Sequence, residues 1–438
     1  MQRRRAITIL LLSVAARSLW SLDANPLLFI YDIYVTTTRC SIAGFGGGNG
    51  GIDEGGDGDD DGRGSNSRRR RRVFPPGTVP TLEGKTVWIT GASSGIGAEL
   101  AIQLAHAGVG HLVLSGRRGG RLEHVARSCR DAASASASAS ASASGVGVGV
   151  RRSFRTSIVA FDMSGGPDVL DAAVSEALLL ASASSSSSGG SGGIDVLVLN
   201  AGRYQCGPAL ETDLDALVPE LMRINFVSPV LLSQKLILAD RWREKDGRGH
   251  VVAVSSLMGR GTSPLNSVYS ATKHALRAYF LALAVEERSW LRVDVVLPGA
   301  VDTGLWDGTM ISATIGRPPD DDDDDAAART QKPPPLYADD RSKMSVRRCA
   351  RLIVSSMIGP NCLFYETWVT LNPGLLWVYT ASYMPNTFHL LSNIVAPLRM
   401  NIWRERGEDA LYLPTLLSHL WGCVADYLAG RTDRLLPA

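Results

Sequence analysis

The sequence has few cysteines and histidines for its length, and neither kind is clustered. Its 438 residues hold six cysteines without a C-x-x-C pair and seven histidines without an H-x-x-x-H pair. This scatter argues against a disulfide framework and a zinc site, so we expect no protein-bound metal. The net charge is only +2, which gives no support for a nucleic-acid partner.

A long apolar run is also missing near the amino terminus. Residues 1–5 include three arginines, and the apolar run over residues 6–16 ends at Arg17. That run is shorter than the roughly 20 residues of a membrane-spanning helix. A basic start followed by a short apolar run is typical of a secretory signal or signal anchor. We expect residues 1–36 to bring the chain to the endoplasmic reticulum membrane, and an organelle presequence is the main alternative.

Several segments have a composition too simple to form a packed core. Residues 37–80 are rich in glycine, aspartate and arginine, which predicts a linker. A serine-alanine repeat and a serine-glycine tract predict disordered surface insertions near residues 131–150 and 182–193. Residues 313–345 contain an aspartate run and predict an acidic insertion, in the region that would cover the substrate in the family that the motifs below resemble.

The rest of the chain alternates between short apolar strands and amphipathic helices. Such alternation predicts an α/β fold with a Rossmann-type doubly wound parallel sheet, in a single catalytic domain over residues 81–312. We expect strands at 86–90, 112–115, 158–162, 196–199, 251–255 and 293–297. We expect helices at 98–107, 122–129, 169–180, 214–238 and 269–287, the fourth interrupted near Pro229.

A glycine-rich turn follows the first expected strand. Glycines here permit a tight turn and a close approach of the backbone to a pyrophosphate, which the helix amino terminus would stabilise. Simple punctuation between a strand and a helix is the alternative, but this position favours a dinucleotide site. The residues expected to line it are Thr90, Gly91, Ser93, Ser94, Gly95, Ile96 and Gly97.

The ends of later strands add to this dinucleotide site. An acidic residue after the second strand would select NAD, but the chain has Arg117 there. A guanidinium suits a ribose 2′-phosphate, so the sequence predicts NADP(H) as cofactor. Asp162 is expected near the adenine, and Asn200, Ala201 and Gly202 beside the nicotinamide ribose.

Tyr269 and Lys273 lie four residues apart on an expected helix, and therefore on one face of it. A neighbouring ammonium favours the phenolate, so Lys273 is predicted to lower the pKa of Tyr269 from its usual value near ~10. Such a pair forms a proton-transfer group that works near neutral pH. Two solvated helix residues are the alternative for the pair in isolation.

Together these motifs resemble the short-chain dehydrogenase/reductase superfamily over about residues 82–310. The resemblance implies that Tyr269 is the acid/base, that Lys273 holds the ribose, and that Ser256, rather than Ser255, polarises the substrate oxygen. It further implies that Asn225 positions a water beside Lys273. The cofactor's carboxamide end would be held by Pro298, Gly299, Val301 and Thr303.

Further matches, among them Tyr383-Met384-Pro385, resemble the subgroup called dehydrogenase/reductase SDR family member seven. That resemblance implies a microsomal, NADP(H)-dependent enzyme for lipophilic carbonyls or alcohols such as retinoids and steroids. Two alternatives remain: a dehydratase or epimerase on the same fold, or an NADP(H)-sensing scaffold with weak catalysis.

Residues 346–438 form a predicted helical extension with many aromatic side chains. Aromatic residues suit a membrane interface or a lipophilic entrance, so membrane association is expected. The alternative is a packed cap or an oligomer contact, which would be consistent with a homodimer.

Overall fold

The computed structural model describes residues 82–144, 154–183, 193–244, 249–303, 310–311, 343–358 and 366–369, with Met400. The chain divides into two units, residues 1–73 and 74–438, and every described residue belongs to the second. The expected leader (1–36) and linker (37–80) therefore lie outside the described residues, which begin at residue 82. So do nearly all of the 182–193 and 313–345 segments.

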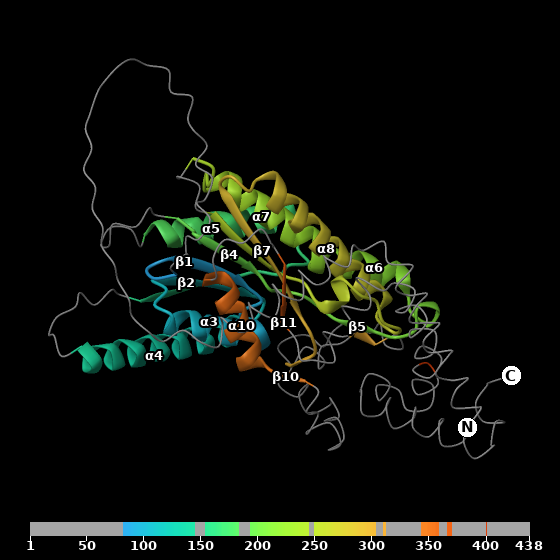
Figure 1. Ribbon diagram of the computed structural model, residues 1–438. Helices are drawn as coiled ribbons and strands as arrows, with labels where there is room; N and C mark the ends of the chain where they lie inside the picture. Colours follow the sequence, from blue (N-terminus) through green and yellow to red (C-terminus); the bar gives the residue numbers. More distant parts are fainter. Residues whose placement is uncertain are drawn as a thin grey trace, which may run out of the picture. The chain divides into compact units, whose positions relative to one another are not determined.

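A seven-stranded sheet is the centre of the fold (Figure 1). Its order is β11-β7-β6-β4-β1-β2-β3, and all neighbouring strands are parallel. The strand order reverses direction after β1, which confirms the predicted doubly wound topology. The strands are β1 Thr86–Thr90, β2 His111–Gly116, β3 Arg155–Ala160, β4 Val196–Leu199, β6 Gly249–Val254, β7 Leu291–Pro298 and β11 Glu366–Val369.

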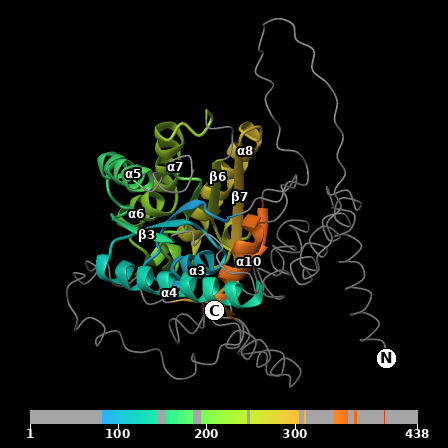
Figure 2. The ribbon, with the colours of Figure 1, turned by 90° about the vertical axis from the view of Figure 1, so that its left-hand side faces the viewer.

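Helices cover both faces of this sheet, as Figures 1 and 2 show. Side chains alternate across a strand, so Ile89 packs in the core on one face and Trp88 in the core on the other. This double burial explains the continuous apolar strand sequences. One face carries α3 Gly95–His106, α4 Gly119–Ser144 and α10 Val346–Ile358; the other carries α5 Pro167–Ser182, α7 Ser228–Ala239 and α8 Ser267–Glu286.

The serine-alanine repeat corrects the insertion predicted near residues 131–150. It is helical as far as Ser144 and forms the second half of α4. Alanine is the best helix former, and serine can bond back to the preceding turn. The Ser134 hydroxyl does so, donating to the Arg130 carbonyl at 2.9 Å. The Ser136 hydroxyl donates to His106 at 3.1 Å and ties α4 to α3.

The helix predicted over residues 214–238 is broken by a π-helical turn, η3 Arg223–Val227, between α6 Leu214–Met222 and α7. Pro229 lies just after the break, in the first turn of α7. It has no N–H to donate to the Asn225 carbonyl four residues earlier, so a regular α-helix cannot continue there. Of the described helices, this continuous stretch alone is long and apolar enough to cross a membrane. Its Leu232 and Leu236 pack in the core, which identifies it as a core helix.

The last described segments complete the sheet, which extends the catalytic domain beyond the predicted end at residue 312. The carboxy-terminal part is helical at α10, as predicted, and β11 then pairs with β7. Smaller pairs join β8 Val301–Asp302 to β10 Met344–Ser345 and β5 Gln205–Cys206 to β9 Met310–Ile311. The 3-10 turns η2 Ala209–Glu211 and η4 Leu257–Gly259 connect the larger elements.

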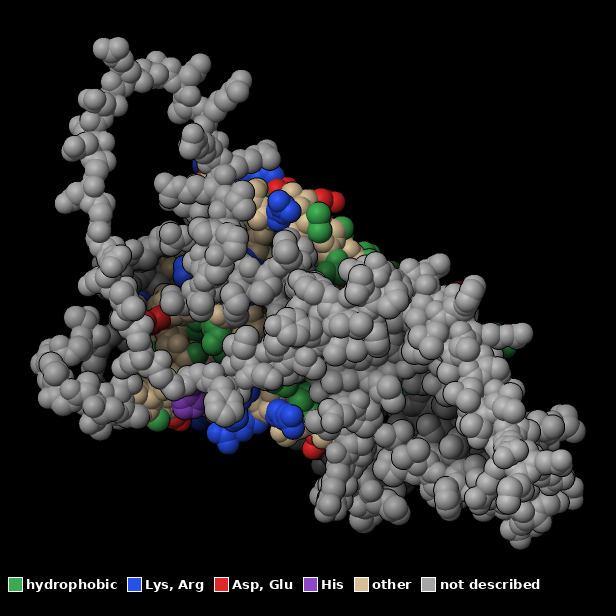
Figure 3. Space-filling model, in the orientation of Figure 1, with side chains coloured by type: hydrophobic (Ala, Val, Ile, Leu, Met, Phe, Trp, Pro, Cys, Tyr) green, Lys and Arg blue, Asp and Glu red, His purple; other side chains and the backbone are tan. Residues whose placement is uncertain are grey.

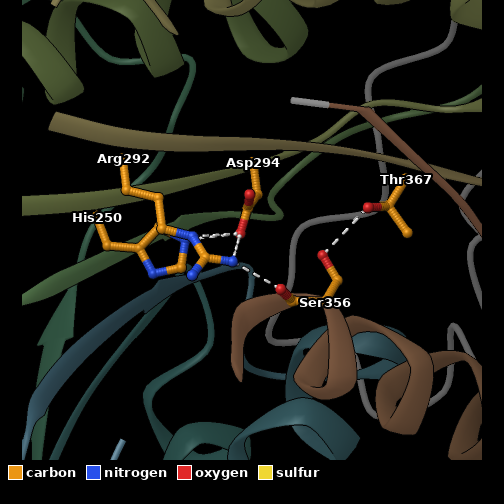
Figure 4. Close-up of polar contacts among 5 residues, drawn as sticks. All are labelled: His250, Arg292, Asp294, Ser356 and Thr367. Atoms are coloured by element: carbon orange, nitrogen blue, oxygen red, sulfur yellow. Dashed lines mark hydrogen bonds and ion pairs between the residues drawn. The ribbon is translucent and has the colours of Figure 1, made fainter. Parts of the chain in front are cut away.

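A buried polar cluster near the start of β6 and β7 holds α10 in place (Figure 4). Asp294 accepts from both His250 and Arg292 at 2.9 Å. Arg292 also donates to the Ser356 carbonyl in the last turn of α10 at 2.8 Å. The Ser356 hydroxyl lies 3.4 Å from that of Thr367 on β11. We call His250, Arg292 and Asp294 the amino-edge cluster.

Charged side chains of both signs are interspersed on the described surface that Figure 3 shows. Because the two signs are mixed, this surface does not produce a strong electrostatic field of one sign.

Candidate active site

The predicted site residues meet at the carboxyl edge of the sheet, where β1, β4, β6 and β7 end. Ligands of open α/β sheets bind at this edge, near the point where the strand order reverses. In this sheet that point lies between β1 and β4.

The glycine-rich turn is built for a close approach of backbone to backbone. Gly91 has φ +67°, and a Cβ there would lie 2.8 Å from the Cα of Ala201. A Cβ on Gly97 would lie 2.3 Å from the Gly91 carbonyl oxygen. Larger residues at these positions would force the turn apart. Ser94 is exposed at the start of α3, whose first turn has no acidic residue, so its amide groups can bind an anion.

Thr90 and Asn200 fasten the first strand to the fourth. The buried Thr90 hydroxyl donates to Val198 at 3.2 Å and accepts from the backbone of Asn200 at 3.1 Å. The Asn200 amide donates to the carbonyls of Thr90 and Gly91, each at 3.2 Å. Both residues were predicted to bind the cofactor. In the structure, their side chains bond backbone groups that shape the turn, and the cofactor contact stays a prediction.

Arg117 and Asp162 lie together beyond the ends of β2 and β3. Their closest charged atoms are 3.9 Å apart, and both side chains are more than 40% exposed. Asp162 also accepts from the Ser164 backbone at 2.8 Å. An exposed pair this long is weak, so the guanidinium can reorient toward a phosphate at small cost. On the neighbouring turn, Ser93 lies close to Gly116.

The residues after β7 return toward the glycine-rich turn. A Cβ on Gly95 would lie 3.4 Å from the Thr303 side chain, so the two segments are neighbours. Gly299 donates to the Val369 carbonyl at 2.8 Å, and Val301 is buried in the core. Pro298, the last residue of β7, is buried as well. Ile96 packs beside the same core.

Tyr269 lies on the first turn of α8 and is 7% exposed. Burial raises its pKa to about 12, and a hydrogen bond with Ser256 has the smaller, opposite effect of lowering the pKa. The neighbouring Ser255 instead donates to the Lys273 carbonyl at 3.0 Å. Ser256 is thus the serine that bonds to the tyrosine, and its role in polarising the substrate oxygen stays a prediction.

Lys273 is buried at 4% exposure, and its ammonium donates to the Val254 carbonyl at 3.1 Å. Burial lowers its pKa to about 8. Its nitrogen is 5.9 Å from the centre of the Tyr269 ring. The pKa of Tyr269 in the protein alone is therefore raised, with burial as the largest cause, and not lowered as predicted.

Asn225 joins the π-helical turn to the catalytic helix. It is fully buried, and its amide donates to Thr272 at 3.1 Å and to the Arg203 carbonyl at 2.9 Å. Thr272 in turn donates to the Tyr269 carbonyl at 2.7 Å. A Cβ on Gly202 would lie 3.3 Å from the Asn225 side-chain oxygen and 3.4 Å from the Lys273 nitrogen. This glycine therefore leaves a small open space beside both groups.

Comparisons with known proteins agree with this arrangement. The family described as short chain dehydrogenase matches residues 85–145 and 166–310. The human protein "Dehydrogenase/reductase SDR family member 7" is 30% identical over 334 residues, which are 75% of this chain and 82% of the relative. Its mouse counterpart is 32% identical over 304 residues, 69% of this chain and 75% of that protein.

The chain belongs to the short-chain dehydrogenase/reductase family. It is thus a member of an oxidoreductase family, and it resembles the member 7 subgroup, as predicted. Among solved structures, a short-chain dehydrogenase from Sphingobium yanoikuyae in complex with NADPH is 22% identical, with a TM-score of 0.47. That similarity covers 70% of this chain and 95% of the other.

Three residues for which the sequence predicted no role also support the short-chain dehydrogenase site. Thr272 bridges Tyr269 and Asn225, as described above. Tyr204 packs edge-on against the Tyr269 ring with 4.8 Å between centroids, and its hydroxyl is 3.0 Å from the Asn266 amide. Gln205 reaches the backbone of Tyr269 from β5. These residues are recognised by their contacts in the folded protein, which the spacing of residues in the sequence does not show.

Proposed function

We propose that the protein is an NADP(H)-dependent oxidoreductase that interconverts a carbonyl and an alcohol on a lipophilic substrate. The observation that carries the proposal is the convergence of Ser256, Tyr269, Lys273 and Asn225 beside the glycine-rich turn. A nucleotide-binding scaffold has no need of a buried tyrosine bonded to a serine next to a buried lysine.

The turn has the features of a dinucleotide cradle. Gly91 and Gly97 leave no room for side chains, Gly95 has a φ of +55° that favours glycine, and α3 presents its amino terminus without an acidic residue. Arg117 lies at the end of β2 with an exposed guanidinium, where a 2′-phosphate would be held. The nicotinamide cofactor, when bound, supplies or accepts the hydride.

The chain's own residues then manage the proton and the substrate oxygen. Ser256 would donate to that oxygen and polarise it, while Tyr269 would give it a proton during reduction. Lys273 would bind the ribose and add positive charge beside the phenol. Asn225 would keep the π-helical turn against α8, so that a water can lie between Lys273 and solvent.

The lipophilic substrate class and membrane association rest on the sequence and on what its resemblance to the member 7 subgroup implies. Residues 1–36 suit an endoplasmic reticulum signal or anchor, and they lie outside the described residues. Alkaline carbonate extraction of membranes from cells that express the full chain tests the anchoring: retention in the pellet supports it, and release contradicts it.

A panel of lipophilic aldehydes and ketones, assayed with NADPH and with NADH, tests the proposed reaction and cofactor. We expect net NADPH oxidation, and we expect Arg117→Ser to reduce the preference for NADPH by about 10- to 100-fold, the value of one charge-assisted contact. Gln103→Leu on α3 serves as a control away from the phosphate turn. NADPH binding without net oxidation across the panel would favour a scaffold or an enzyme that reuses its cofactor.

A further inference from the structure

Gln205 is a buried polar residue outside the predicted site that forms three hydrogen bonds, one within its own segment and two with the segment that begins α8. It lies on the short strand β5, close to the start of α8 (Figure 1), and is 1% exposed. Its amide nitrogen donates to the carbonyls of Gly207 and Leu265, each at 3.1 Å. Its oxygen accepts from the backbone N–H of Tyr269 at 3.4 Å. Both the nitrogen and the oxygen of this carboxamide are therefore bonded to backbone groups.

Leu265 has a strained backbone. Its φ is +75°, a value that favours glycine and is strained for a residue with a Cβ. Its carbonyl is fixed by two donors, the Gly207 N–H at 2.8 Å and the Gln205 amide at 3.1 Å. The side chain is buried at 4% exposure. Strain persists where the surroundings fix it, and it is common next to functional sites.

The turn that contains Leu265 leads directly into the helix that carries Tyr269. The first four N–H groups of a helix have no partner within it, and Tyr269 belongs to that first turn. The N-cap residue Asn266 provides no side-chain cap. Gln205 supplies an acceptor from another strand instead, although the 3.4 Å separation makes this the weakest of its three bonds.

The same turn forms one wall of an open hollow of about 330 Å³. Its lining is mostly apolar and includes Pro208, Leu210, Ser263, Pro264, Leu265 and Ser267. A shift in the Leu265 turn would therefore move this wall and the first turn of α8 together. A displacement near 1 Å can reduce turnover by about 10²-fold even when no reacting group is changed.

We propose that Gln205 is a positioning residue for Tyr269: its carboxamide holds the strained Leu265 turn against the first turn of α8. The contacts stand independently, but the kinetic consequence rests on the proposed carbonyl reduction. Gln205 acts through Tyr269 and the Leu265 turn and need not touch the substrate.

Amide hydrogen exchange at Tyr269 tests the contact without any assay of turnover. In Gln205→Leu, we expect this N–H to exchange about tenfold faster, because it loses its acceptor, while core amides of β1 and β4 are unchanged. Gln103→Leu, which removes an amide that bonds Glu99 and Arg347, is the matched control and should leave Tyr269 unchanged. Unchanged exchange at Tyr269 in folded Gln205→Leu overturns the proposal, whether or not the enzyme reduces carbonyls.

Steady-state kinetics then test the positioning. We expect Gln205→Leu to lower kcat/KM for the carbonyl by about 10²-fold with an unchanged Kd for NADPH, since the glycine-rich turn is untouched. Gln205→Glu keeps the acceptor but loses both donors, and it should give an intermediate loss. Equal losses in NADPH affinity and in turnover would indicate general unfolding and would contradict a positioning role.

A double-mutant cycle with Leu265→Gly tests the role of the strain. Glycine adopts φ +75° at no steric cost, so the turn needs less support from Gln205. We expect Gln205→Leu to change kcat/KM by no more than about threefold in the Leu265→Gly background. A full effect of about 10²-fold in that background would contradict the proposed coupling.

Discussion

The two ends of strands β6 and β7 bury ionisable groups in different ways. At the amino edge, Asp294 lies between Arg292 and His250, so charge is matched within the cluster. At the carboxyl edge, Lys273 contacts a carbonyl and an aromatic ring among the described residues, and Tyr269 is bonded to a neutral serine. The amino edge stabilises the fold, whereas the carboxyl edge keeps groups whose protonation can change. Pairing, more than burial, distinguishes a structural cluster from a catalytic one.

The largest expected effect comes from removing the buried cation at the carboxyl edge. We expect Lys273→Met to lower turnover by about 10³-fold, since the ammonium assists proton transfer. The same change should leave the free energy of unfolding equal or higher, because a buried ammonium without a carboxylate costs desolvation energy. Chemical denaturation and NADPH oxidation measure the two quantities. A large loss of stability would show that Lys273 is mainly structural.

The opposite result is expected at the amino edge. Asp294→Asn leaves Arg292 and His250 without their shared carboxylate and should cost about 3–5 kcal/mol of unfolding free energy. Turnover per folded molecule should be close to wild type. The control is Asp171→Asn, which breaks an exposed pair with Lys235 and should cost no more than about 1 kcal/mol. If the two substitutions cost the same, Asp294 does not anchor the fold.

A smaller effect is expected from pH. Burial, with a contribution from Arg155, lowers the pKa of His111 to about 4, and burial also lowers the pKa of His250. Both rings stay neutral in the folded protein below pH 6.5, while the unfolded chain binds protons. Unfolding free energy should therefore fall as pH drops from about 6.5 to 4, by about 3 kcal/mol for His111.

Denaturant titrations at several pH values check this dependence. His111→Gln should flatten it, whereas His124→Gln, at an exposed position, should leave it unchanged. An unaltered slope in His111→Gln would mean that this ring titrates normally.

Local patterns predicted most of the sheet and the residues that gather at its carboxyl edge. Most strands up to β7 are largely apolar runs between turns, and Tyr269, Lys273 and Ser256 lie at fixed offsets from them. The last unit, α10 and β11, was placed in an extension because an acidic segment separates it from β7 in sequence.

Properties that depend on packing were not predictable from spacing. The pKa of Tyr269 is raised mainly by burial, and the Tyr-x-x-x-Lys pattern gives no information on burial. Gln205 contacts the backbone of a distant segment, and Thr272 joins the distant Asn225 side chain to the Tyr269 carbonyl. The serine-alanine repeat was expected to be a loop because of its low complexity, but alanine's helix propensity extends α4.

Turnover per folded, NADPH-binding molecule in Tyr269→Phe and Asp294→Asn, with one lipophilic carbonyl substrate, tests the contrast most directly. Tyr269→Phe should bind NADPH and melt like wild type yet lose about 10³-fold or more in turnover, because it lacks the proton donor. Asp294→Asn should melt at a lower temperature and keep its turnover per folded molecule. Wild-type turnover in Tyr269→Phe, or an equal loss in both variants, would contradict the division between a catalytic carboxyl edge and a structural amino edge.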